Sequence, residues 1–281
     1  MKERIASHLT ATHNVVMLAA LLGIGLTGSV GTSPAPISDT LVQRVQFGKV
    51  GAPAQVALAT NAQAARFPLK FSPNSYYDQL RAKLNWLPIR YAGNLLKTPD
   101  SESRLLLAQS AAKRAGLEQV GLSYRDVYGI IRAETSWIPR LGASKDGTPN
   151  LGLAQFEPAT AKAVGLTDPS DPVQAVHAAA LHLRDAAVWS AKRIANLKLT
   201  PEQRAVKLRE GVSIYYNLSS KGRSVWNGLN TATLPIETRR HIANARIGAR
   251  EAGELEQQLE ELKGRMSQPG MMTASYQSNG G

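Results

Sequence analysis

One acidic side chain lies on the apolar face of a predicted helix. The helix begins at Ser123, which can cap it. Val127, Ile130 and Ile131 have the i, i+3, i+4 spacing of a buried face. Glu134 follows Val127 by seven residues and lies on that face to within about 20°, in the last turn. Partial burial and the negative end of the helix dipole both favour the protonated carboxyl. We therefore expect Glu134 to be able to donate a proton as a general acid.

A structural role for the same glutamate is the alternative. Glu134 could form an ion pair with Arg132 or with an arginine of a neighbouring helix. Structural ion pairs also shift the pKa of buried carboxyl groups, so the position of Glu134 does not by itself identify an active site. The residues that follow it reverse the balance in favour of catalysis.

Four segments place polar and small residues at helix ends and in a loop. They are, in chain order, IIRAETSWIPRLGASKDGTPNLGLAQFEPATAKAVG with Glu134, Ser144, Gly152-Leu153-Ala154-Gln155 and Thr160-Ala161; DPVQAVHAAALHL; Ile214-Tyr215-Tyr216-Asn217; and LPIETRRHIANARIG. Together they resemble the core motifs of the soluble lytic transglycosylase (SLT) family across about residues 101–247. The glutamate motif alone would be weak, but the four segments in this order are specific.

The resemblance implies both a fold and a reaction. It implies a lysozyme-like, mostly α domain with a groove for alternating N-acetylmuramic acid and N-acetylglucosamine. Glu134 would protonate the leaving oxygen and then act as base on the muramoyl 6-hydroxyl, leaving a 1,6-anhydro sugar. No metal or other cofactor is implied. A second carboxylate is not needed, because the substrate's acetamido group can stabilise the oxocarbenium-like state.

The resemblance also carries substrate-binding roles to matched positions. These are Thr135, Ser144, Gly152, Leu153, Gln155, Tyr216 and Asn217. Gln155 could hydrogen-bond an acetamido or hydroxyl group, or could instead fix its own loop. Tyr216 could orient Glu134, line the site or fill the core, and Thr135 stands where the family usually has serine.

Departures from the family pattern bear on substrate fit more than on the fold. Ala154 replaces a methionine, the turn after Asn217 reads Leu-Ser-Ser-Lys-Gly, and His241 stands where the closing tyrosine is expected. A hydrolytic mechanism like that of goose-type lysozymes also stays open, in which Asp146 or Glu157 of the loop would act as the base that holds a water molecule. A third reading is a non-catalytic glycan-binding or structural part of an envelope machine.

The surrounding elements are predicted to be mostly helical. Ala-rich stretches and few aromatic residues favour helix, and no strand of convincing length is predicted. The predicted parts are a signal peptide or anchor (1–31), a loose arm (32–75), a helical lead-in (76–100), the transglycosylase domain (101–247), a charged helix (248–266) and a disordered tail (267–281). His177 and His182, five apart on one helix, are expected to be packing residues.

The first residues and the charge indicate where the chain acts. Lys2 and Arg4 precede the apolar run Val15–Leu26, which small residues follow, as in a secretory signal. We expect a periplasmic protein, or one anchored to the inner membrane by this segment alone.

The net charge of +12 suits an acidic polymer or surface as a binding partner. The expected partner is peptidoglycan, within a secretion, conjugation or virion entry machine, and no nucleic acid is expected because no recognition motif is present. The chain has no cysteine, so disulfides are excluded.

Overall fold

The computed structural model describes residues 76–144 and 146–267, and these are mostly helical. The longer elements are α2 (Ser101–Ala115), α3 (Tyr124–Thr135), α5 (Pro172–Arg193), α6 (Pro201–Asn217) and α8 (Ile236–Met266). The shorter ones are α1 (Tyr76–Arg81), β1 (Trp86–Tyr91), β2 (Asn94–Pro99), β3 (Gly142–Ala143), β4 (Pro149–Asn150), α4 (Pro158–Ala163), α7 (Ser220–Ser224) and the 3₁₀ turns η1 (Leu117–Val120) and η2 (Thr231–Thr233). The mostly α prediction is confirmed and is consistent with a lysozyme-like domain. The predictions for residues 1–75 and 268–281 lie outside the described residues.

Helix α3 carries Glu134, and local interactions set both of its ends. Ser123 and Asp126 form a reciprocal capping box at the start. Ser136 and Trp137 end the helix with φ angles of 53° and 65°, in the left-handed region. The Trp137 side chain is fully buried, and this burial stabilises the sharp change of direction. The helix therefore stops before Pro139, with Glu134 in its last turn.

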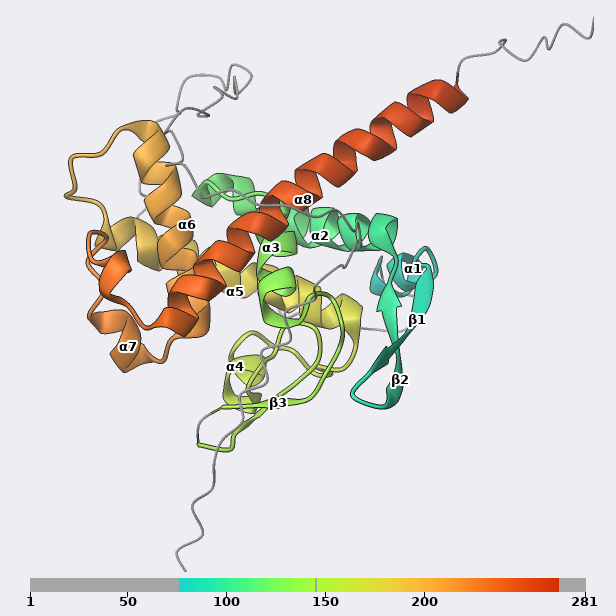
Figure 1. Cartoon of the computed structure of the whole chain (residues 1–281), viewed down its shortest axis with the longest axis horizontal. Helices are drawn as coiled ribbons and strands as arrows, with labels where there is room; N and C mark the ends of the chain where they lie inside the picture. Colours follow the sequence, from blue (N-terminus) through green and yellow to red (C-terminus); the bar gives the residue numbers. More distant parts are fainter. Residues whose placement is uncertain (1–75, 145, 268–281) are drawn as a thin grey trace, which may run out of the picture. The chain divides into compact units, whose positions relative to one another are not determined.

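Helix α8 packs against α3 along most of the length of α3 (Figure 1). A Cβ added at Gly129 would lie 2.3 Å from the Ala245 carbonyl oxygen, so the two backbones almost touch there. The paired positions run in opposite directions, since Arg125 contacts Glu256 whereas Glu134 contacts His241. The helices are therefore antiparallel, and the end of α3 meets the beginning of α8.

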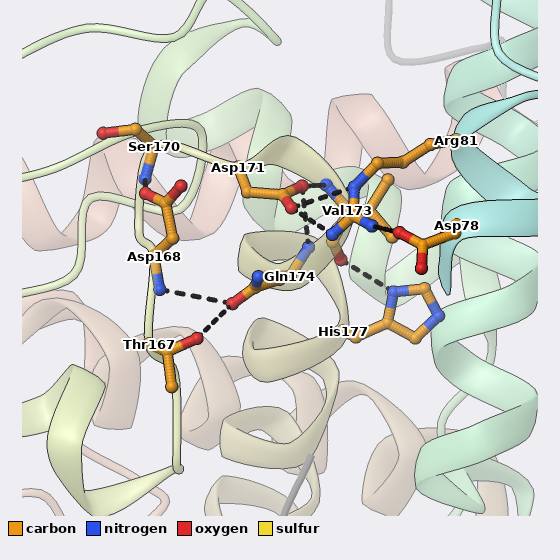
Figure 2. A network of polar contacts seen from close by, with 9 residues as sticks. All are labelled: Asp78, Arg81, Thr167, Asp168, Ser170, Asp171, Val173, Gln174 and His177. Carbon is orange, nitrogen blue, oxygen red and sulfur yellow. Dashed lines mark hydrogen bonds and ion pairs between the residues drawn. The ribbon is translucent and has the colours of Figure 1, made fainter. Parts of the chain in front are cut away.

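Helix α5 forms the centre of the core between α2 and α6. Its alanines from 175 to 187 are almost completely buried, so neighbouring helices approach closely. Asp171 caps the helix by accepting from the backbone N–H of Val173 at 2.8 Å. The same carboxylate binds Arg81 of α1, which also pairs with Asp78, as Figure 2 shows. This network ties the first described helix to the central one.

His177 and His182 are packing residues, as the sequence predicts. His177 lies between the Ser110 hydroxyl and the Val173 carbonyl, at 2.8 Å from each. His182 makes ring contacts with Phe156, Tyr215 and Tyr216.

The helical lead-in predicted for residues 76–100 is wrong after Arg81. Strands β1 and β2 form an antiparallel hairpin whose register runs from Trp86↔Pro99 to Tyr91↔Asn94. Its two-residue turn, Ala92-Gly93, has positive φ at both positions, which is the geometry that best joins twisted strands. Pro88 breaks a helix but is tolerated here, because every strand of a two-stranded sheet is an edge.

The predicted boundary at residues 247–248 does not separate two elements. Helix α8 runs without a break from Ile236 to Met266, so the charged segment continues the helix that carries His241. Figure 1 shows the last turns of α8 extending past the other described helices. Among the described residues, no helix combines the length and apolarity that a membrane span requires.

Candidate active site

The carboxyl group of Glu134 contacts an imidazole rather than a guanidinium. Oε1 of Glu134 lies 2.8 Å from Nε2 of His241, and the Glu134 side chain is 16% exposed. Arg132, the expected structural partner, instead pairs with Glu251 on α8. Among the described residues no arginine pairs with the carboxyl group of Glu134, and its hydrogen-bond partner is His241.

His241 is the residue of this site that sequence reasoning missed. It lies in the second turn of α8, its side chain is 6% exposed, and Nε2 faces Glu134. Nδ1 is buried and has no hydrogen-bond partner among the described residues. The sequence registers His241 only as a departure from an expected tyrosine, and that departure was the available signal.

Tyr216 lies at the site through its ring. The ring stacks on the imidazole of His241, with 6.4 Å between centroids and 16° between planes. Its hydroxyl donates to the Ala154 carbonyl oxygen at 2.9 Å, and so joins α6 to the loop before α4. Burial, together with the nearby charge of Glu134, raises the pKa of Tyr216 well above its ordinary value. Tyr216 therefore acts here as a neutral hydrogen-bond donor.

Arg140 is a second contributor that the sequence did not indicate. One guanidinium nitrogen donates to the Glu134 carbonyl oxygen at 2.6 Å, and the other donates to the Tyr91 hydroxyl at 3.0 Å. The first bond satisfies a carbonyl at the C-terminal end of α3. The second ties the β1–β2 hairpin to the helix end that carries Glu134.

Gln155 fixes its own loop, which is one of the two roles predicted for it. Its side-chain amide donates to the carbonyl oxygens of Arg140 and Gly152, both at 2.9 Å. Gly152 has φ +72°, and a Cβ there would lie 2.0 Å from the Pro169 carbonyl oxygen. Only glycine fits this approach, which holds the loop against the segment before α5.

Thr135 and Leu153 are buried at the junction of α3 with this loop. The Thr135 hydroxyl donates to the Leu153 carbonyl oxygen at 2.8 Å, and the two residues are 2% and 1% exposed. Their side chains therefore hold the loop next to Glu134. Substrate contact by either residue stays a prediction.

The remaining predicted residues lie in local networks. The Ser144 hydroxyl donates to Glu157 at 2.5 Å, and Asn150 donates to Ser144 at 3.2 Å. Asn217 accepts from the Thr238 hydroxyl at 3.0 Å, which links the end of α6 to α8. Asp146 is exposed and accepts from the backbone N–H of Thr148, a bond that lowers the pKa of this carboxyl.

The structure thus brings Glu134, His241 and Tyr216 together, with Arg140, Thr135 and Gln155 holding the segments around them. A carboxyl group hydrogen-bonded to an imidazole can hold, give and take back a single proton. Within the described ranges, no group of three or more potential metal ligands is assembled.

Comparison with known proteins gives one partial similarity to report. The chain is 38% identical over 71 residues to a protein named "Transglycosylase" of Enterobacteria phage PRD1. This stretch covers 25% of the chain and 26% of the phage protein, so the match spans about a quarter of each. No protein-family profile and no solved structure matches the chain.

Proposed function

We propose that the chain is a lytic transglycosylase that cleaves the glycan strands of peptidoglycan. The observation that carries the proposal is the shielded carboxyl of Glu134, held by an imidazole at the end of α3. A transglycosylase function in general is supported by the partial similarity to the phage protein of that name. Both point to acid–base chemistry at a glycosidic bond.

The proposed reaction uses one carboxyl group twice. Glu134 gives its proton to the glycosidic oxygen between N-acetylmuramic acid and N-acetylglucosamine as the C1–O bond breaks. The substrate's acetamido group stabilises the positive charge that develops at C1. The Glu134 carboxylate then takes the proton of the muramoyl 6-hydroxyl while O6 bonds to C1. The product is a 1,6-anhydro sugar, no water is consumed, and Glu134 is again protonated.

The residues around Glu134 have separate tasks in this proposal. Tyr216 and Arg140 hold the loop and the helix end that flank the acid. Thr135, Ser144, Gly152, Leu153, Gln155, Tyr216 and Asn217 remain the proposed residues of the substrate-binding region. For Thr135 and Leu153 their burial makes shaping that region the proposed contribution.

The proposed place of action is the bacterial envelope. Peptidoglycan lies outside the inner membrane, and the N-terminal segment has the order of a secretory signal or anchor. We propose that the chain opens the wall locally for an envelope-spanning or virion entry machine. Fractionation of cells that make the full chain tests this placement, and recovery only from the cytosol would contradict it.

Digestion of purified peptidoglycan tests the reaction directly. The parent protein is expected to release fragments whose muramoyl ends have the mass of the 1,6-anhydro sugar. Glu134→Gln is expected to lower the rate about 10²–10⁴-fold, because the amide cannot donate the proton. The matched control is Glu157→Gln, which changes a carboxylate whose partner among the described residues is Ser144 of the same loop, and this variant should cleave at close to the parent rate.

Each other outcome of this digestion identifies a different function. Reducing ends instead of anhydro ends, with loss of activity in Glu157→Gln, would establish hydrolysis and overturn the transglycosylase. No cleavage by a folded parent protein would favour the non-catalytic structural role.

A further inference from the structure

The hydrogen bond between His241 and Glu134 can be made in either direction. The imidazole can donate from Nε2–H, or it can accept there a proton from the carboxyl group. The 2.8 Å separation between Nε2 and Oε1 fits both directions. The choice matters because it decides which oxygen of Glu134 carries the transferable proton.

The surroundings of Nδ1 restrict the protonation of the ring. Nδ1 is buried and has no acceptor among the described residues. A buried group without a partner costs about 1–3 kcal/mol, and the cost is higher when it is charged. A proton on Nδ1 would leave a buried N–H donor there without an acceptor, which loses its hydrogen bond to water and gains none in return. The neutral ring with a bare Nδ1 is therefore favoured, and its proton lies on Nε2.

The reaction cycle favours the same tautomer. Glu134 must alternate between carboxyl and carboxylate if it acts first as acid and then as base. An Nε2–H group donates to Oε1 in both states without moving. A bare Nε2 would instead direct its lone pair at the carboxylate in the second state, and the contact would be repulsive.

We infer that His241 is a positioning residue that donates Nε2–H to Oε1 of Glu134 throughout the cycle. The transferable proton is then held on Oε2, the oxygen that His241 leaves free for substrate. His241 itself neither gains nor loses a proton. The ring of Tyr216 stacks on one face of the imidazole and so limits how far the imidazole can turn. This inference rests on the proposed function for its kinetic part, but the hydrogen bond itself does not.

Nitrogen NMR of the histidine side chains in the full ¹⁵N-labelled chain tests the tautomer without any substrate. His241 is assigned by the signals that disappear in His241→Gln. The expected result, at the pH of the peptidoglycan digestion, is a ring that carries its proton on Nε2 and none on Nδ1. Glu134→Gln, which keeps an acceptor oxygen, should retain this tautomer, whereas Glu134→Leu should lose the preference. A ring that carries a proton on Nδ1 would overturn the inference.

Kinetics on purified peptidoglycan test the positioning role. His241→Leu removes the donor and is expected to lower kcat about 10–100-fold with little change in KM, because a misplaced catalytic group costs about that much. His241→Gln restores an N–H donor that cannot titrate, and should recover most of the lost kcat. Equal losses in both variants, with both folded, would show that His241 only fills space. If the parent protein does not cleave peptidoglycan, the proposed function fails and the NMR result alone decides the hydrogen bond.

Discussion

At the scale of single residues, most polar side chains around Glu134 hydrogen-bond to backbone carbonyls of the protein itself. Tyr216 donates to Ala154, Thr135 donates to Leu153, and Gln155 binds two loop carbonyls. The Tyr216 bond joins α6 to the loop before α4, whereas the Thr135 and Gln155 bonds hold that loop to the end of α3 and to itself. Together these bonds fix the segments around the Glu134 carboxyl group, as the proposed reaction requires.

Removal of the Tyr216 hydroxyl is expected to destabilise the fold while the ring stays in place. Tyr216→Phe leaves the carbonyl of Ala154 without its donor, and Ala154 is completely buried. The free energy of unfolding should fall by about 1–3 kcal/mol, as measured by urea denaturation. Tyr215→Phe is the matched control, because the Tyr215 hydroxyl has no hydrogen bond within the described part of the chain. Equal stability of Tyr216→Phe and Tyr215→Phe would contradict the assigned role.

At the scale of elements, the crossing of α3 and α8 decides whether the site exists. The backbones approach at Gly129 and Gly248, where the distance from an added Cβ at Gly248 to the Gly129 Cα would be 2.9 Å. This approach brings His241 on one helix to Glu134 on the other. Side chains of ordinary size at the crossing would separate the two groups that the proposed reaction needs.

Gly129→Ala is therefore expected to be destabilising although alanine favours helix. The new Cβ would lie 2.3 Å from the Ala245 carbonyl oxygen, and such overpacking costs about 1–3 kcal/mol. Thermal and urea unfolding measure the loss. The control is Gly264→Ala near the end of α8, where an added Cβ meets no atom within 4 Å, so stability should be unchanged or rise by up to about 1 kcal/mol. A Gly129→Ala protein as stable as the parent would show that the helices can move apart freely.

At the scale of the whole molecule, the buried His177 and the half-buried His182 tie stability to pH. Burial lowers the pKa of His177 to about 4, and burial together with Arg223 lowers the pKa of His182 to about 4. In the unfolded chain both would titrate near 6.5. Between these values the unfolded state binds more protons than the folded state, so protonation favours unfolding.

The free energy of unfolding should therefore be largest above pH 6.5 and fall as the pH drops toward 4. Each histidine contributes on the order of 3 kcal/mol to this loss. The pKa of Asp100 is also lowered, and protonation of this carboxyl group reduces the free energy of unfolding only below its ordinary pKa of 3.8. Urea denaturation at pH 7 and at pH 4.5 measures the change, and His177→Gln should flatten it. A stability that does not change with pH over this interval would contradict the lowered pKa of these two rings.

The sequence by itself determined the helices and the face on which Glu134 lies. Apolar spacing and caps such as Ser123, Asp171 and Thr200 act within a few residues, so they can be read from the chain. The hairpin was missed because Pro88 hid its strands, although the Ala92-Gly93 turn was visible in the sequence. The order of the motifs also selected Tyr216 as a candidate site residue, and its ring lies against His241.

The tertiary structure decided the partners of that acid. His241 lies 107 residues from Glu134 in the chain, and Arg140 reaches both the Glu134 carbonyl and the hairpin. Likewise, only the folded loop shows that Gln155 binds backbone carbonyls. Such contacts depend on how closely helices cross and how loops close, and these are properties of packing between distant segments rather than of local spacing.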